Sequence, residues 1–173
     1  MKKIGLLLLF IFIFSLLLII WGLSLDRSDS GAIGVTVRDD AVKSIPAGSV
    51  HWHPHLTIKI NGEIVPIPTD IGVSIGRIKD TRLSGMRMSP THTHESDGTI
   101  HLENLNPRSK PETLTLGYFF HVWDKPLNST CILEYCTDNG TLTMHVNGQE
   151  NNEYRNYLMH DKDEIVIEYD SKD

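Results

Sequence analysis

Four tight-turn dipeptides divide the chain after residue 50 into short segments in which apolar and polar residues alternate. Asparagine or aspartate followed by glycine supplies the positive φ angles that a two-residue hairpin turn needs. The dipeptides are Asn61-Gly62, Asp97-Gly98, Asn139-Gly140 and Asn147-Gly148. Segments beside them, such as 56–60 and 142–146, alternate with the period of two that is typical of half-buried strands. The pattern predicts a mainly β fold built from hairpins.

One aromatic segment interrupts this β pattern. Residues 113–124 are rich in Phe, Tyr and Trp, and we predict a helix there with Thr115 as its N-cap. A strand is the alternative, because aromatic residues also favour strands. With a last strand at 165–169, the chain is expected to form a single small α+β domain, mainly β.

The C-terminal part of this domain resembles a known fold. Residues 141–146, the turn at Asn147-Gly148 and residues 161–169 look like the last strands of a β-grasp sulphur carrier. Such carriers need a Gly-Gly tail, whereas this chain ends in Ser-Lys-Asp. The resemblance therefore implies a β-grasp-like fold and no carrier chemistry.

An apolar run near the N-terminus predicts a membrane anchor. Residues 4–25 carry no charged side chain, and roughly 20 apolar residues span a bilayer as a helix. Lys2 and Lys3 precede the run, so the positive-inside tendency places the later residues outside the cytoplasm. We expect a single-pass cell-membrane protein with an anchor at 4–25, a linker at 26–48 and an extracytoplasmic domain at 49–173. A cleaved signal peptide is the alternative.

Cysteines, glycosylation motifs and charge agree with an exported domain. Cys131 and Cys136 are the only cysteines, and outside the cytoplasm such a pair is expected to form a disulfide. A pair of thiolate ligands for a soft metal is the alternative. Asn128 and Asn139 each begin an N-glycosylation sequon, which predicts a glycoprotein. The formal net charge of −6 argues against a nucleic-acid partner.

Histidine is concentrated in two rows. Six of the nine histidines fall in these rows, which are His51, His53, His55 and His92, His94, His101. Residues at i, i+2 and i+4 of a strand share a face. We expect a strand over 51–60, in which the apolar residues have even numbers and the histidines have odd numbers. In the second row, Leu102 faces away from its neighbour His101. Both rows are therefore predicted to lie opposite the apolar face, although Pro54 implies an edge or a bulge.

A hairpin around Asp97-Gly98 would bring the second row together. With a two-residue loop His94 lies across from His101, and His92 lies across from Glu103. With a four-residue loop His92 faces His101. Opposed Cβ atoms are about 4.5–5.5 Å apart, which is within reach of joint ligation. A three-residue loop would turn His101 to the other face, so the convergence depends on loop length.

Two histidine rows in one small domain predict a metal site, because imidazole is the commonest metal ligand near neutral pH. The expected ligands are His51, His53, His55, His92, His94, His101 and Glu103. Met86, Met88 and His121 are further candidates, the last because the aromatic segment could approach the site. A histidine face that is solvated or senses pH without a metal is the alternative.

The residue types in this set favour copper. Three imidazoles with an open coordination position suit Cu²⁺ or Zn²⁺. The thioethers of Met86 and Met88 suit Cu(I), so copper is the favoured cofactor and zinc the alternative. Two histidines with Glu103 would make a two-His-one-carboxylate set for Fe(II), which leaves iron open as well.

A series of motifs in a fixed order resembles one family. The motifs are His51 to Leu56, Ile67 to Gly72, His92 to Glu103, Thr115 to Trp123, Val146 to Gly148 and Asp161 to Tyr169. The series resembles a family of exported, membrane-anchored, histidine-rich proteins of archaea, notably ammonia oxidisers, and of some bacteria. The resemblance implies the same boundaries and a histidine site but no particular reaction. Since ammonia-oxidising archaea use copper heavily, it also favours copper.

The sequence thus predicts an anchored extracytoplasmic protein that binds or delivers copper, as an accessory to a membrane complex or to a metal acceptor. Two alternatives stay open. A zinc- or iron-dependent enzyme would need a deep pocket and a carboxylate such as Glu95, Asp97 or Glu103 near a bound water. A metal-free interaction subunit would need histidines that splay apart.

Overall fold

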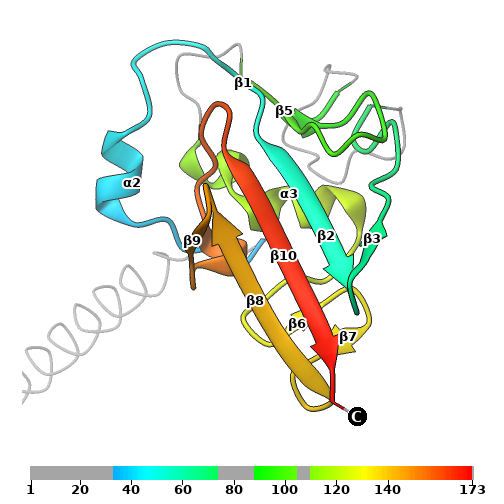
Figure 1. Cartoon of the computed structure of the whole chain (residues 1–173). Helices are drawn as coiled ribbons and strands as arrows, with labels where there is room; N and C mark the ends of the chain where they lie inside the picture. Colours follow the sequence, from blue (N-terminus) through cyan, green and yellow to red (C-terminus); the bar gives the residue numbers. More distant parts are fainter. Residues whose placement is uncertain (1–32, 74–87, 105–109, 173) are drawn as a thin grey trace, which may run out of the picture. The chain divides into compact units, whose positions relative to one another are not determined.

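A five-stranded mixed sheet forms the centre of the fold (Figure 1). The computed structural model describes residues 33–73, 88–104 and 110–172. The sheet contains β2 (His55–Ile60), β3 (Glu63–Val65), β8 (Gly140–Val146), β9 (Gln149–Glu150) and β10 (Glu164–Ser171). Their order is β3-β2-β10-β8-β9, with β10 parallel to β2 and antiparallel to β8. The prediction of a mainly β domain is confirmed.

Two of the four expected tight turns join neighbouring strands of this sheet. Asn61-Gly62 connects β2 to β3 and Asn147-Gly148 connects β8 to β9, and all four residues have φ angles between 52° and 81°. Gly140 is instead the first residue of β8. A Cβ atom there would lie 2.3 Å from the ring of Tyr169, so glycine allows a close approach rather than a turn.

The aromatic segment forms helix α3 (Leu116–Trp123), as predicted, after a short 3-10 helix, η2 (Pro111–Leu114). Thr115 is its N-cap, because its hydroxyl oxygen accepts a hydrogen bond from the backbone N–H of Tyr118 at 3.1 Å. In Figure 1 α3 crosses behind the sheet, and a second 3-10 helix, η3 (Tyr154–Asn156), packs against it.

The core is formed by one face of the strands and by α3. Ile58 of β2 and Ile167 of β10 are fully buried, because alternate residues of a strand point to the same face. Phe119 of α3 is fully buried too. Removing these apolar side chains from water is the main favourable contribution to folding. The opposite face of β2, which carries His55 and the other odd-numbered residues of that strand, is left for polar contacts.

A second, three-stranded sheet carries three of the candidate ligands, His51, His92 and His101. It consists of β1 (Val50–Trp52), β5 (His101–Asn104) and β4 (Thr91–His92), which are antiparallel neighbours in the order β1-β5-β4. The expectation of one strand over 51–60 was wrong, since β1 ends at Trp52 and the next strand, β2, belongs to the large sheet. Pro54 lies at the change of sheet, where a residue without an N–H costs no ladder hydrogen bond.

A disulfide closes a small hairpin at the other end of the large sheet (Figure 1). β6 (Cys131–Ile132) and β7 (Tyr135–Cys136) pair antiparallel. Cys131 and Cys136 lie directly opposite each other, with Cα atoms 4.1 Å apart. The predicted disulfide is confirmed, so the thiolate alternative is set aside.

The compact unit that contains both sheets begins at Val35. Val35 is buried, and a five-residue helix, α2 (Asp39–Lys43), follows it, so the expected linker at 26–48 overlaps this unit. The expected anchor at 4–25 lies outside the described residues. Within the part of the chain that is described, no helix is long and apolar enough to span a bilayer.

Candidate metal centre

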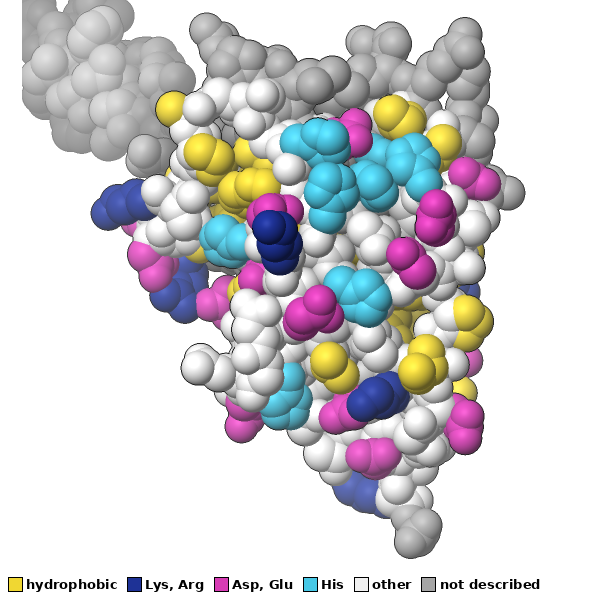
Figure 2. All heavy atoms as spheres, turned by 45° about the horizontal axis from the view of Figure 1, so that its top comes forward, with side chains coloured by type: hydrophobic (Ala, Val, Ile, Leu, Met, Phe, Trp, Pro, Cys, Tyr) yellow, Lys and Arg dark blue, Asp and Glu magenta, His cyan; other side chains and the backbone are white. Residues whose placement is uncertain are grey.

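Five histidines converge at the end of the domain that carries the small sheet. They form two groups of three whose ligand nitrogens all lie within 4.8 Å of one another, and His101 belongs to both. We call His51, His53 and His101 the outer set, and His92, His94 and His101 the inner set. Figure 2 shows a cluster of histidine side chains on this face of the molecule, with acidic side chains beside it.

The register of the small sheet brings these side chains together. His92 of β4 lies opposite His101 of β5, and His51 of β1 lies opposite Glu103 of β5. The pairing of His92 with His101 is the register expected of the four-residue loop. The connection is longer, however, because ladder pairing stops at His92, and the chain meets the start of β2 only near residue 99, where Thr99 forms an isolated bridge to His55.

His92 is held in the form that binds a metal. Its side chain is fully buried, and Nδ1 lies 2.8 Å from the carbonyl oxygen of Ser89. A carbonyl oxygen only accepts, so Nδ1 carries the proton and the neutral ring keeps a lone pair on Nε2. That Nε2 lies 3.2 Å from Nε2 of His94. Two nitrogens at about 2.05 Å from one tetrahedral ion are separated by about 3.3 Å, so this pair already has ligand spacing.

His101 is the member that both sets share. Its Nδ1 is buried and has no hydrogen-bond partner among the described residues. Buried polar atoms are almost always paired, so this nitrogen is free to act as a ligand. Its ring lies 4.8 Å from that of His53 and 4.7 Å from that of His94, centroid to centroid. His101 therefore connects the two groups.

Burial keeps the central imidazoles neutral. It lowers the pKa of His92 below the ordinary value of a histidine, against a smaller opposing effect of the Ser89 carbonyl. Burial and then the neighbouring imidazoles of His92, His94 and His53 lower the pKa of His101. Since only the deprotonated nitrogen binds a metal, both rings are ready to act as ligands at neutral pH.

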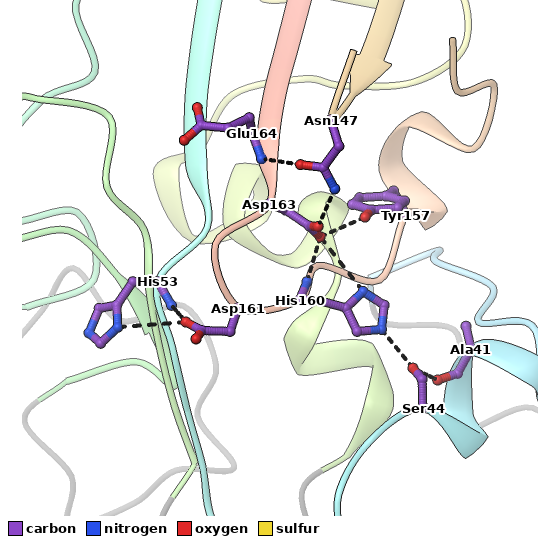
Figure 3. A network of polar contacts seen from close by, with 9 residues as sticks. All are labelled: Ala41, Ser44, His53, Asn147, Tyr157, His160, Asp161, Asp163 and Glu164. Atoms are coloured by element: carbon purple, nitrogen blue, oxygen red, sulfur yellow. Dashed lines mark hydrogen bonds and ion pairs between the residues drawn. The ribbon is translucent and has the colours of Figure 1, made fainter. Parts of the chain in front are cut away.

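Two carboxylates flank the outer set. One oxygen of Glu103 lies 3.3 Å from Nε2 of His51 and 3.9 Å from Nδ1 of His101. Asp161 accepts a hydrogen bond from the backbone N–H of His53 at 2.9 Å, and its carboxylate lies 3.9 Å from Nδ1 of the same residue (Figure 3). Carboxylates behind ligand histidines orient the rings and favour a bound cation. Asp161 lies in the motif 161–169, but nothing in the sequence paired it with His53.

An open pocket of about 270 Å³ adjoins the inner set. It is lined by His94, Glu95, Asp97, Thr99 and His101. The carboxylate of Asp97 accepts hydrogen bonds from the backbone N–H and the hydroxyl of Thr99, at 2.8 and 3.0 Å. These hydrogen bonds lower the pKa of Asp97, so the pocket wall is anionic at neutral pH.

Several sequence candidates lie outside both sets. His55 is turned toward the loop, with Nε2 2.7 Å from the carbonyl oxygen of Asp97 and Nδ1 3.4 Å from the carboxylate of Glu164. His121 is on α3, where its ring lies 6.4 Å from that of Tyr118. Met86 lies outside the described residues, and Met88 is half-buried one residue before Ser89. The Ser89 contact had no sequence signal, because it uses a backbone carbonyl.

A separate network contains a serine, a histidine and an aspartate (Figure 3). Ser44 Oγ lies 2.6 Å from Nε2 of His160, whose Nδ1 is 3.6 Å from the carboxylate of Asp163. In a nucleophilic triad the histidine is hydrogen-bonded directly to the carboxylate, and the serine hydroxyl donates its hydrogen bond to the histidine. Here the second distance is too long and Ser44 donates to the carbonyl oxygen of Ala41 at 2.6 Å. The network joins α2 to the loop before β10 and is structural.

Comparison of the chain with protein-family models, with curated proteins and with solved structures found no match. The resemblance to exported histidine-rich proteins therefore stays a prediction. What the structure itself supplies is a histidine cluster compatible with a metal ion, and function is inferred from its geometry.

Proposed function

We propose that the protein binds one transition-metal ion through the inner set and delivers it to an acceptor outside the cytoplasm. The observation that carries this proposal is the His92–His94 pair, whose Nε2 atoms are 3.2 Å apart with the tautomer of His92 fixed by Ser89. Two imidazole nitrogens at that distance share a proton or an ion. A third nitrogen, from His101, lies within 4.8 Å of both.

Copper is the metal that this donor set favours. Nitrogen sites bind divalent first-row metals in an order that peaks at Cu²⁺, ahead of Zn²⁺ and Fe²⁺. Three neutral imidazoles also leave an open position for a fourth ligand, as both copper and zinc sites do. Met88 lies four residues before His92, so the sequence offers a thioether close to the inner set for Cu(I).

Delivery fits the exposure of the cluster better than catalysis does. The side chains of His51 and His53 are 65% and 40% exposed, so a partner's ligands can reach them directly. A metal-dependent hydrolase is the second candidate, favoured by one observation. Glu95 and Asp97 line the pocket beside the inner set, where a carboxylate could take a proton from a metal-bound water. The convergence of five histidines speaks against a metal-free interaction subunit.

The cellular setting belongs to the same proposal. The apolar run at 4–25 would anchor the protein in the cell membrane with the histidine domain outside, and the acceptor would be a membrane complex or another exported protein. The disulfide between Cys131 and Cys136 supports an oxidising compartment.

The topology supports a β-grasp-like description of the fold. Two hairpins flank the helix in sequence, β2–β3 before it and β8–β9 after it. The first and last strands of the large sheet, β2 and β10, pair in parallel at its centre. This extends the sequence resemblance from the last strands to the whole sheet.

The test is metal content by ICP-MS on the full chain, purified natively in detergent without a His tag. We expect about one equivalent of copper, as for a single tri-histidine site, and clearly less than one equivalent retained through purification in His94→Ala, which keeps only two ligands of the inner set. His145→Ala is the matched control, because His145 is a half-buried histidine of β8 outside both sets. Stoichiometric zinc with hydrolytic activity would favour the enzyme. Failure to bind Cu²⁺ or Zn²⁺ even after loading would refute the metal site.

A further inference from the structure

The two histidine sets differ in their access to solvent. In the outer set the side chain of His51 is largely exposed and that of His53 is partly exposed. In the inner set His92 is fully buried and is fixed by Ser89. The shared residue, His101, is intermediate, with 22% of its side chain exposed. The outer set is therefore suited to contact with a donor or acceptor, and the inner set to retention of an ion.

We propose that a single metal ion occupies the two sets in turn and passes between them while it stays bound to His101. This inference rests on the proposed metal-binding function. The inner set is the resting position, and the outer set is the position from which the ion exchanges with a partner. Because each set needs the same imidazole, an ion can change position by replacing two ligands without leaving the protein.

The exchange is a substitution of ligands with no change in oxidation state. On the inward step the bonds from the ion to His51 and His53 break, and bonds to His92 and His94 form. Nδ1 of His92 carries a proton toward Ser89, so the proton between the two Nε2 atoms belongs to His94. As the ion binds, His94 changes tautomer: the proton leaves Nε2 and Nδ1 takes one up from solvent, so the ring stays neutral, and solvent can reach it because His94 is exposed.

Simultaneous occupation of both sets is disfavoured. Two ions bound to one imidazole would require His101 to lose its remaining proton and to use both ring nitrogens. Two divalent cations would also repel each other across a single ring. The Glu103 carboxylate, which lies near both His51 and His101, offsets the charge of one ion next to the shared ligand.

The experiment compares exchange kinetics with equilibrium affinity on the full chain in detergent. Cu²⁺ loading and its release to EDTA are followed by stopped-flow absorbance, and the final site is identified by EPR. In His51→Ala/His53→Ala we expect loading and release to slow together, because the position from which the ion exchanges is lost, while the EPR spectrum of the loaded protein still reports the ligands of the inner set. His94→Ala is expected to load at the wild-type rate and to end with a different spectrum and faster release.

Neither variant removes a core side chain, because His51 and His94 are exposed and the side chain of His53 is 40% exposed, and His145→Ala controls for the loss of a histidine as such. Wild-type exchange rates in His51→Ala/His53→Ala would overturn the proposal, because ions would then use the pocket beside His94 directly. Two equivalents of copper with two EPR signals in the wild-type protein would also overturn it. Absence of copper binding in the wild-type protein would refute the metal site itself.

Discussion

The carbonyl oxygen of Leu56 lies so close to Gly98 that no side chain fits between them. A Cβ atom at position 98 would be 2.4 Å from that oxygen. The contact is fixed from both directions, since the backbone N–H of Leu56 donates to the carbonyl oxygen of Gly98 at 2.9 Å. It ties the loop between the ligands His94 and His101 to the first residues of β2.

Gly98→Ala is therefore expected to displace this loop and weaken metal binding. Alanine would carry a φ of 94°, at a cost of about 1 kcal/mol, and would add the collision with Leu56. Gly148→Ala is the matched control, because Gly148 also has a positive φ but nothing within 4 Å of its Cβ position. Copper affinity should fall only for Gly98→Ala, whereas equal affinities in the two variants would show that the loop does not position the ligands.

The metal-free protein is expected to lose stability as the pH falls below about 6.5, the ordinary pKa of histidine in an unfolded chain. Burial lowers the pKa of His92 and His101 in the folded state, so the unfolded chain binds more protons in this range. Their contribution is present above the unfolded pKa and is lost as the pH falls through the folded pKa. Thermal unfolding with a chelator from pH 8 to pH 5 measures the slope.

His92→Gln should flatten that slope, because the most buried of the titrating groups is gone. The control is His121→Gln. His121 is only half-buried and lies outside the cluster. A slope identical to that of the wild-type protein in His92→Gln would contradict the assignment.

Glu103→Gln is expected to reduce copper affinity by about ten- to a hundredfold, as the loss of a carboxylate behind ligand histidines commonly does. The carboxylate lies 3.3 Å from His51 and 3.9 Å from His101, and glutamine keeps its shape while removing its charge. Chelator competition measures the affinity. Glu134→Gln, in the distant disulfide hairpin, should bind copper as the wild-type protein does.

Asp163→Asn is expected to destabilise the fold by about 3 kcal/mol, because a buried carboxylate that accepts several hydrogen bonds is lost. Asp163 accepts from the Tyr157 hydroxyl at 2.6 Å, the His160 backbone N–H at 2.7 Å and the Asn147 amide at 2.9 Å (Figure 3). Urea unfolding at pH 7 measures the loss, with the exposed Asp138→Asn as control.

The same carboxylate predicts acid sensitivity. Burial alone raises the pKa of Asp163, but the His160 imidazole and the hydrogen bonds from Tyr157, His160 and Asn147 outweigh it and lower the pKa below its ordinary value. Its contribution is therefore present above about pH 4 and is lost as the pH falls through the folded pKa. The stability difference between wild type and Asp163→Asn should shrink in that range, and a constant difference would refute this account.

Replacing both cysteines by serine is expected to cost about 2 kcal/mol, the entropy of closing a loop of about six residues in the unfolded chain. The hairpin of β6 and β7, which contains Cys131 and Cys136, lies at the opposite end of the large sheet from β1 and β5 (Figure 1). Copper stoichiometry should be unchanged while the midpoint of urea unfolding falls. A loss of copper in this variant would mean that the two ends of the domain are coupled.

Local sequence signals predicted the elements whose causes are local. Alternation located β2 and β8, and a short apolar segment located β10. Asn61-Gly62 and Asn147-Gly148 located their hairpins, and Thr115 located the start of α3. Each depends on residues a few positions apart. The same holds for the disulfide, whose cysteines face each other across one short hairpin.

The centre itself depends on contacts between distant segments, and there the sequence was less informative. The pairing of β1 with β5 brings His51 and His53 to His101, but nothing in residues 50–53 specifies that partner. The change of sheet at Pro54 separates His55 from its row, although the spacing of the three residues is regular. A periodic pattern assigns side chains to a face, and tertiary pairing decides which of them meet.

The small sheet has strands of only three, four and two residues in β1, β5 and β4, so its own backbone pairing is limited. An ion in the inner set would cross-link segments that are separated by residues 95–100, and an ion in the outer set would cross-link segments that are separated by residues 54–100. Metal content would then set how firmly this end of the domain is ordered. The opposite end is fastened by a covalent disulfide, so the two ends of one domain would respond to different chemical conditions, metal supply at one and redox state at the other.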